Sequence, residues 1–338
     1  MDHYAVLWTR TALGPVKMGN LLANYRETRF SYDPNYVTHT DAPGVSLLIQ
    51  PVTWAADPYI HYTGEALPFP PRLMALVPEH NLNNVQRWYH SRLINSERRH
   101  PGGASRFELE WELLMRAGHG GIGHIDIFAD DRKAETAYAI NRDTTHSVGS
   151  LSMLLQLFRK NRRDMASDIG AMAHLLGPLP SVEGMNPKLL VAIPDSKRWD
   201  GLFAAPDIRQ VGTEHFTDVV LKIEDARYPG VLALEALCYA VHRELGFETP
   251  RTWYREIDGF PVLAVERFDR DVNGHPIPME SFFSVYATGN SEVNWADDAM
   301  MEDVAYMLVR LGELTQLDAA KASLAQLSGF APVKLTTY

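Results

Sequence analysis

A lysine placed inside an apolar run restricts what this chain can fold into. Residues 219–223 read Val-Val-Leu-Lys-Ile, and the alternation of this run predicts a β-strand that carries Lys222. A predicted apolar helix over Val231–Leu245 then carries Glu235. A charged side chain among apolar residues is costly unless it is paired or bound to an opposite charge. The strand lysine and the helix glutamate are therefore candidates for an ion pair.

Lys222 leaves two interpretations open. Protein kinases use a strand lysine and a helix glutamate to hold nucleotide phosphates, so this lysine could clamp the phosphates of ATP. A lysine near the edge of a sheet can instead extend its stem along apolar surface and place its charged end in water. The glutamate on the following helix favours the first interpretation.

A predicted hairpin follows the helix. Strands over Trp253–Glu256 and Pro261–Glu266 flank Asp258-Gly259, a dipeptide typical of two-residue hairpin turns. The second strand ends in Glu266-Arg267-Phe268-Asp269-Arg270, whose backbone N–H and C=O groups could contact an adenine edge. The alternative is a local cluster of ion pairs at the end of a strand.

A turn rich in glycine and proline precedes the predicted strand Leu189–Ile193. Residues 180–188 read Pro-Ser-Val-Glu-Gly-Met-Asn-Pro-Lys, which is not the Walker sequence of P-loop proteins. This loop could supply backbone N–H groups to a phosphate, or it could be a structural turn only. Its candidate phosphate-loop residues are Ser181, Gly184 and Lys188.

These segments resemble the HipA family of serine/threonine kinase toxins, which belong to bacterial type II toxin–antitoxin modules. The similarity lies in Leu-Lys-Ile at 221–223, in Glu-Ala-Leu-Cys-Tyr-Ala-Val-His-Arg-Glu-Leu-Gly-Phe at 235–247, and in Leu-Ala-Val-Glu-Arg-Phe-Asp-Arg at 263–270. The N-terminal third is similar to the small domain that precedes the kinase core in that family, through Leu76–Glu79, Arg106–Arg116 and Gly118–Ile127.

The resemblance implies an ATP site with Mg²⁺ as its metal. It implies that Lys222 contacts the ATP phosphates and that Glu235 holds this lysine. The adenine-binding hinge would consist of Glu266, Arg267 and Phe268.

The resemblance also assigns roles to the loop before the predicted strand at 189–193. Ser181 occupies the place of a serine that members of the family autophosphorylate, and Gly184 and Lys188 would lie on the phosphates. Met185-Asn186-Pro187 departs from the small and amide residues that the family has in this loop.

The fold implied by the resemblance is α+β and similar to that of protein kinases. It divides the chain into an N-terminal subdomain at 1–135, a β-rich small lobe at 136–275, and the start of a helical large lobe at 276–338. The large lobe is expected to be incomplete, because no segment after Arg270 matches the family's Gly-Asn-x-Asp-x-His-x-Lys-Asn catalytic segment or its later metal-binding aspartate. Gly289–Asn294 is similar only in part, since it lacks the Asp, His and Lys.

The sequence therefore predicts a HipA-like serine/threonine kinase toxin that binds ATP but lacks a catalytic residue and a metal ligand, which leaves its activity as a transferase open. The alternative is a pseudokinase or interaction module that binds an antitoxin or a separate catalytic subunit. An unrelated enzyme is a third hypothesis. Against it, the 13 histidines show no H-E-x-x-H spacing, and no G-x-S-x-G elbow is present.

Composition limits the partners and the compartment. The net charge of −10 argues against direct contact with nucleic acid. The resemblance implies a helix-turn-helix antitoxin, which would carry any DNA contact, and an aminoacyl-tRNA synthetase as substrate. The single cysteine excludes an internal disulfide. No signal peptide and no run of about 18 apolar residues is recognisable, so we expect a cytoplasmic protein without a membrane span.

Periodicity predicts the remaining elements. Strands are expected at Tyr4–Trp8 and Val16–Asn20, and helices at 82–97, 105–117, 151–178 and 299–325. Ser105 and Glu108 form a capping-box pattern at the start of the second helix. The polar segment 129–150 is expected to be a linker, and 195–217 a loop or hairpin.

Overall fold

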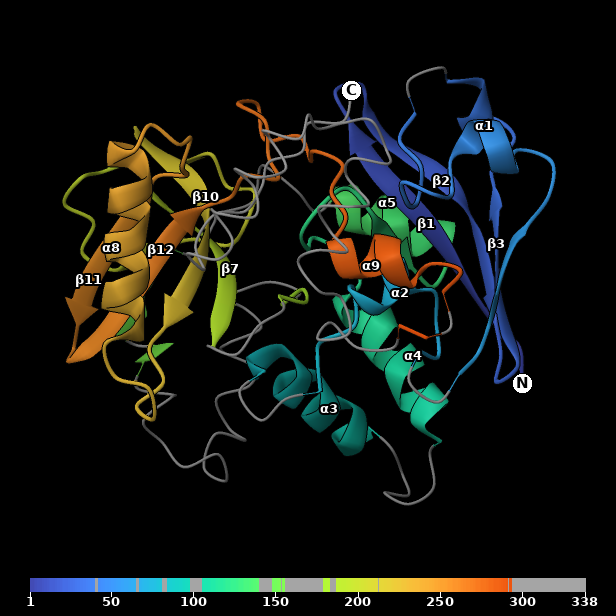
Figure 1. Ribbon diagram of the computed structural model, residues 1–338, viewed down its shortest axis with the longest axis horizontal. Helices are drawn as coiled ribbons and strands as arrows, with labels where there is room; N and C mark the ends of the chain where they lie inside the picture. Colours follow the sequence, from blue (N-terminus) through green and yellow to red (C-terminus); the bar gives the residue numbers. More distant parts are fainter. Residues whose placement is uncertain are drawn as a thin grey trace.

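The protein is described by a computed structural model at residues 1–39, 42–64, 67–80, 84–97, 105–139, 148–152, 154–155, 179–182, 187–211, 213–290 and 292–293. Within these residues the chain forms two larger sheets, one on each side of the molecule, with helices packed against them (Figure 1). The strand pairs of both sheets are antiparallel. The structure confirms the mixed helix-and-sheet fold class that the sequence predicts.

Five strands make up the N-terminal sheet. They are β1 (His3–Thr11), β2 (Gly14–Ala23), β3 (Glu27–Tyr32), β4 (Tyr59–Tyr62) and β5 (Asp126–Phe128), in the order β4-β3-β2-β1-β5. The first three form the meander that the sequence predicts in part. At Gly19 of β2 an added Cβ would lie 2.2 Å from the Ser31 carbonyl oxygen, so this close approach of β2 and β3 requires glycine.

Helices of different lengths accompany the N-terminal sheet. They are the 3₁₀ helix η1 (Tyr36–Thr38), α1 (Pro51–Trp54), α2 (Pro71–Met74), α3 (Val85–Glu97) and α4 (Arg106–Ala117). α4 begins as predicted, because the Ser105 hydroxyl accepts a hydrogen bond from the Glu108 N–H at 3.3 Å. Its buried side chains Trp111 and Leu114 share one core with Leu7 of β1.

The segment 129–150 is not the linker that its polarity predicts. It contains helix α5 (Asp131–Ala139) and strand β6 (Gly149–Ser150). α5 packs on the N-terminal sheet through Ala134, which is fully buried beside Val6 and Phe128. The prediction is wrong because the residues that pack on the sheet, Ala134, Ala137 and Tyr138, give only a weak apolar signal: two of them are small, and the rest of the segment is polar.

Five strands make up the C-terminal sheet, and four of them form its main path. These four are β7 (Lys188–Pro194), β10 (Glu214–Ile223), β11 (Thr252–Ile257) and β12 (Phe260–Glu266), in the order β11-β12-β10-β7. Two short strands, β8 (Leu202–Phe203) and β9 (Gln210–Val211), lie between β7 and β10 in the chain, and β9 forms a hairpin with the start of β10. Asp258 and Gly259 join β11 to β12 with φ angles of 51° and 77°, which confirms the predicted hairpin turn.

Alternation along β10 separates the two faces of this sheet. Val219, Leu221 and Ile223 point into the larger core, which also contains Tyr89 of α3. Lys222 therefore projects from the opposite face. Helix α8 (Val231–Glu244) packs against that face.

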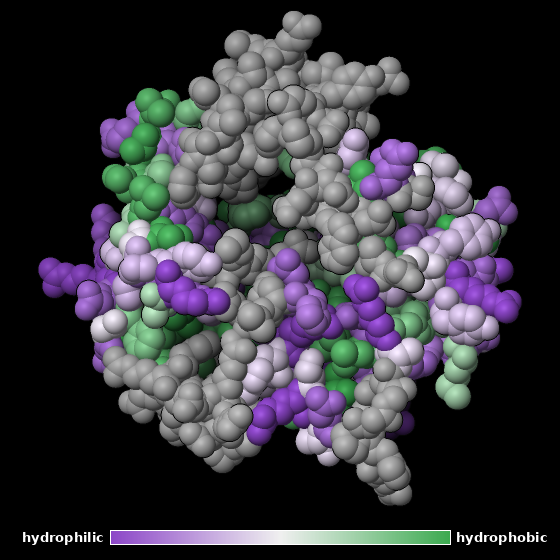
Figure 2. All heavy atoms as spheres, turned by 60° about the horizontal axis from the view of Figure 1, so that its bottom comes forward, coloured by the Kyte–Doolittle hydropathy of each residue, from purple (hydrophilic) through white to green (hydrophobic). Residues whose placement is uncertain are grey.

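Helix α8 is held by the sheet on one side only. Its Leu232 and Tyr239 pack against Leu263 and Val265 of β12. The other side is apolar and exposed, and apolar atoms gather at the left edge of Figure 2, where Figure 1 places this helix. Its large exposed side chains, each between 40% and 68% exposed, are Val231, Leu234, Leu237, Val241 and Leu245.

The last described helix is α9 (Phe282–Ala287). The predicted helix at 299–325, most of the predicted helix at 151–178, and Gly184 lie outside the described residues. None of the helices that the structure describes is long and apolar enough to cross a membrane.

The contact between α3 and α4 provides a test of the fold. Arg87 of α3 and Glu110 of α4 form a buried bidentate ion pair with N–O distances of 3.0 and 2.6 Å. Replacing Glu110 with alanine leaves the guanidinium buried without its carboxylate, so we expect the free energy of unfolding in urea to fall by about 3–5 kcal/mol. The control Glu97→Ala removes the partner of Arg116 between the same helices, where Glu97 is 59% exposed. It should cost about 1 kcal/mol or less. Equal losses would contradict the burial of the Arg87 pair.

Candidate functional site

Lys222 of β10 and Glu235 of α8 form an ion pair between the sheet and its covering helix. The Lys222 ammonium donates a hydrogen bond to Glu235 Oε1. The two side chains are largely buried, with exposed fractions of 18% and 13%. The structure thus brings together the two charges that the sequence singled out, where an unpaired charge would be costly.

Lys188 of β7 lies directly opposite Lys222 in the C-terminal sheet. Opposite residues of an antiparallel pair project from the same face, with Cβ atoms about 4.5–5.5 Å apart. Two lysine stems therefore neighbour each other beside Glu235. Two ammonium groups on the same face of the sheet could both contact a bound polyanion.

Glu266 ends β12 with its side chain engaged by Arg251. The guanidinium donates to the two carboxylate oxygens of Glu266, each at 2.9 Å, and also to Asp195 at 2.7 Å. Burial raises the pKa of Glu266, but the hydrogen bonds from Arg251 outweigh this effect and lower it. The carboxylate therefore serves to fix the strand end.

Arg267, Asp269 and Arg270 form a buried ionic cluster. Arg267 donates to both carboxylate oxygens of Asp269, at 2.9 and 2.7 Å, and Arg270 donates to one of them at 2.6 Å. Each of the three side chains is 3% exposed or less. Burial raises the pKa of Asp269, but the two arginines outweigh this effect and hold it below its usual range. The local ion-pair cluster that the sequence allows is thus present.

A loop from the N-terminal part of the chain anchors this cluster. This loop, residues 118–124, is the glycine loop. It contacts the ionic cluster through main-chain groups of Gly121 and Gly123. Gly121 O accepts hydrogen bonds from Arg267 at 2.7 Å and from Arg270 at 3.1 Å, Gly123 O accepts one from Arg270 at 3.1 Å, and Gly123 N–H donates one to Asp269 at 2.8 Å.

The main chain of Phe268 differs from that of its two predecessors. Glu266 N–H donates to Arg251 O, and Arg267 N–H donates to Asp218 O, each at 2.9 Å. Phe268 N–H makes no hydrogen bond to the described part of the chain. Among the three predicted hinge residues, Phe268 is therefore the one whose N–H makes no backbone hydrogen bond within the described residues.

Ser181 is buried beside the glycine loop. Its carbonyl oxygen lies 3.8 Å from the position of an added Cβ on Gly121, and the residue is 5% exposed. Its hydroxyl has no hydrogen-bond partner among the described residues. Of the predicted phosphate loop, the structure thus places Lys188 beside Lys222 and Ser181 beside Gly121.

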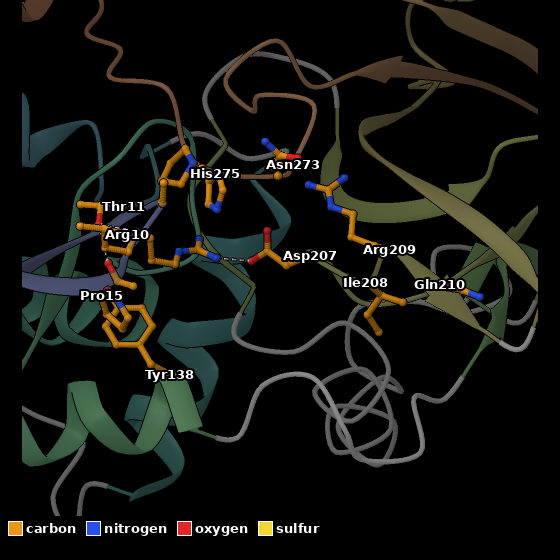
Figure 3. A pocket seen from close by; sticks show the side chains of 15 residues that line it. Arg10, Thr11, Pro15, Tyr138, Asp207, Ile208, Arg209, Gln210, Asn273 and His275 are labelled. Atoms are coloured by element: carbon orange, nitrogen blue, oxygen red, sulfur yellow. Dashed lines mark hydrogen bonds and ion pairs between the residues drawn. The ribbon is translucent and has the colours of Figure 1, made fainter.

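A cavity of about 610 Å³ lies where the two halves of the chain meet (Figure 3). Arg10 of β1 and Asp207, between β8 and β9, point toward each other there and form an ion pair at 2.7 Å. Arg209 and His275 also line the cavity. The cavity lies at the start of β10, and Lys222 lies near the end of that strand.

Sequence reasoning missed Arg10 and Asp207. The arginine lies next to the last residue of β1 and the aspartate lies in a polar segment, so neither position carries a local signal. Burial raises the pKa of Asp207, but Arg10 and Arg270 outweigh this effect and lower it to about 2. Asp207 thus stays ionised between an arginine from each half of the chain. The Nε of Arg270 lies 3.7 Å from its Oδ1.

Comparison with known proteins finds a similarity in the C-terminal part of the chain. Residues 180–329 match the model of the family described as the HipA-like C-terminal domain. No curated protein matches the chain.

Among solved structures, the chain is similar to one from the HipA, HipB and operator DNA complex of the toxin–antitoxin system of Shewanella oneidensis MR-1. The two are 19% identical with a TM-score of 0.47, and the match covers 79% of this chain and 51% of the other. The chain thus spans about half the length of that relative. The matched residues 180–329 contain Lys222, Glu235 and the Asp269 cluster, so these residues lie in the part of the chain that is similar to HipA-like C-terminal domains.

Proposed function

We propose that this chain binds ATP on the face of the C-terminal sheet that carries Lys222, as a HipA-like component of a bacterial toxin–antitoxin module. The observation that carries the proposal is the Lys222–Glu235 ion pair, with Lys188 opposite the lysine. Kinases hold nucleotide phosphates with such a strand lysine and helix glutamate. The family match of residues 180–329 supports the assignment.

Each residue has a separate task in this proposal. Lys222 and Lys188 neutralise the phosphates, and Glu235 keeps the first lysine in place. Phe268 N–H donates to the adenine edge. β10 pairs Val219 with Glu266, so the hinge begins about 10 Å along the strand from Lys222 at a rise of about 3.4 Å per residue. An extended nucleotide can span the two positions.

The described residues contain no acidic cluster of the size that holds a metal ion by itself. They bring no group of three or more His, Cys, Asp or Glu side chains together in a metal-binding arrangement. Mg²⁺ at a nucleotide is commonly held by one or two carboxylates together with the phosphates. The role proposed for these residues is the binding of ATP.

An interaction module is the second candidate function. The exposed apolar side of α8 favours it, because monomeric soluble proteins rarely expose large contiguous apolar patches without a binding role. The lysine and glutamate would then fix α8 against the sheet.

The proposed organisation remains an N-terminal subdomain at 1–135, a kinase-like small lobe at 136–275, and the start of a large lobe at 276–338.

The proposed partner is a helix-turn-helix antitoxin in the cytoplasm. The similar solved structure is named as a complex of HipA with HipB and operator DNA. The net charge of −10 disfavours direct contact of this chain with DNA, so the antitoxin would carry that contact. If the chain also transfers phosphate, an aminoacyl-tRNA synthetase is the substrate that the resemblance implies.

The nucleotide site is tested by replacing Lys222 with methionine. In the wild-type chain, ATP at 100 times its dissociation constant should stabilise the fold by about 2.7 kcal/mol, seen as a higher melting temperature. Lys222→Met should abolish this shift, with and without Mg²⁺, because the cation at the phosphates is lost. The control Lys17→Met breaks the 2.7 Å Lys17–Asp131 pair in the N-terminal sheet and should leave the shift intact. A wild-type chain without any ATP shift would refute the site.

Phosphoryl transfer is tested with ATP labelled on its γ-phosphate. We expect no label on the chain itself or on added aminoacyl-tRNA synthetases, because no catalytic-loop motif follows Arg270 in the sequence. Label that disappears in the Lys222→Met variant would show that the chain is an active kinase, contrary to this expectation.

Partner binding is tested by co-expression with a helix-turn-helix protein encoded beside the chain. We expect the two to co-purify, and the complex to retard operator DNA that the chain alone leaves unbound, because the acidic surface of the chain repels phosphates. Retardation of DNA by the chain alone would contradict this assignment.

A further inference from the structure

The hinge segment, residues 266–270, is attached to the other half of the chain at two points. Its Arg267, Asp269 and Arg270 make four hydrogen bonds to main-chain groups of Gly121 and Gly123 in the glycine loop. Its Arg270 also approaches Asp207, which is paired with Arg10 of β1. The hinge segment is therefore held from the N-terminal sheet as well as by its own sheet.

The backbone conformation of the glycine loop is restricted at this contact, and Gly123 leaves little room for a side chain. Gly123 has a φ of +83°, a conformation that side chains rarely adopt. A Cβ added there would lie 3.0 Å from an Arg72 nitrogen and 3.3 Å from the Met279 carbonyl oxygen. The loop backbone thus presents its N–H and C=O groups in one fixed arrangement.

Separating the hinge segment from the glycine loop also requires a large free energy. Asp269 is 1% exposed and is bound by two guanidinium groups and the Gly123 N–H. Removing a partner from a buried, hydrogen-bonded charge leaves that charge without compensation. A shift of the glycine loop therefore has to move the side chains of the hinge segment with it.

Phe268 lies between the two anchored residues Arg267 and Asp269. Its N–H makes no backbone hydrogen bond to the described residues, whereas the N–H groups of Glu266 and Arg267 do. We infer that the glycine loop of the N-terminal part sets the position of the Phe268 main chain and thereby controls how tightly the site binds the adenine part of ATP. The inference rests on the ATP site proposed above.

The test compares two ligands on the full chain. ATP uses both the hinge and the lysines, whereas inorganic tripolyphosphate can use the lysines alone. Asp269→Asn removes the carboxylate charge of the cluster in the hinge segment. Gly123→Ala strains the backbone of the glycine loop and keeps every charged side chain of the cluster. Each variant should weaken ATP binding by about tenfold, within the range of measured couplings between sites, and should leave tripolyphosphate binding unchanged.

Matched controls separate positioning from general loss of stability. Glu110→Gln converts another buried, arginine-bound carboxylate to an amide, between α3 and α4. Gly14→Ala strains another glycine of positive φ, +121°, where no atom lies within 4 Å of an added Cβ. Both should bind ATP and tripolyphosphate as the wild-type chain does, even where their melting temperature falls.

The outcomes distinguish the two proposals. Affinities are measured by calorimetric titration below the melting temperature of each variant. A wild-type chain that binds neither ligand refutes the ATP site itself. If the wild-type chain binds both ligands and the Gly123→Ala and Asp269→Asn variants bind ATP with the wild-type affinity, the inference is refuted. Equal losses for ATP and tripolyphosphate in these variants also refute it, because they would show general disruption rather than a shift of the hinge.

Discussion

The buried carboxylate of Asp269 is the interaction on which the arrangement of the two sheets depends. It binds Arg267 and Arg270 beside it and the Gly123 N–H from a distant part of the chain. A buried ion cluster is only as stable as its complete set of partners, because the desolvation cost of each charge remains when a partner leaves. The strand end and the glycine loop are therefore joined as one unit, although 146 positions separate Gly123 from Asp269.

The two faces of the C-terminal sheet have different physical roles. The face with Val219, Leu221 and Ile223 contributes to stability through apolar burial. The face with Lys222 combines apolar packing of α8 with two lysines and one glutamate. A charge on this face is tolerated because the helix supplies its partner. The same pair keeps the lysine in one conformation, which lowers the entropy lost when an anion binds.

The sequence predicted the part of the site that depends on local pattern. The strand around Lys222, the helix with Glu235 and the Asp258-Gly259 turn are each specified by periodicity or turn chemistry within a few residues. The register that places Lys188 opposite Lys222 and the pairing of Arg10 with Asp207 were not predictable. They depend on strand alignment and on contacts between distant segments. The spacing of residues within a short segment does not reveal either of these. Helix α5 was missed because Ala134, Ala137 and Tyr138, which pack on the sheet, are a weak apolar signal within a polar segment.

The one-sided packing of α8 affects how the protein behaves in concentrated solution. The helix exposes a row of large aliphatic side chains on the side turned away from the sheet. Water favours the association of such rows, and this attraction grows as stabilising salts such as sulfate are added. The net charge of −10 opposes association through long-range repulsion, which salt screens. A salt such as sulfate thus strengthens the attraction and weakens the repulsion together, so a low concentration of such salts is the condition that keeps copies of the chain apart.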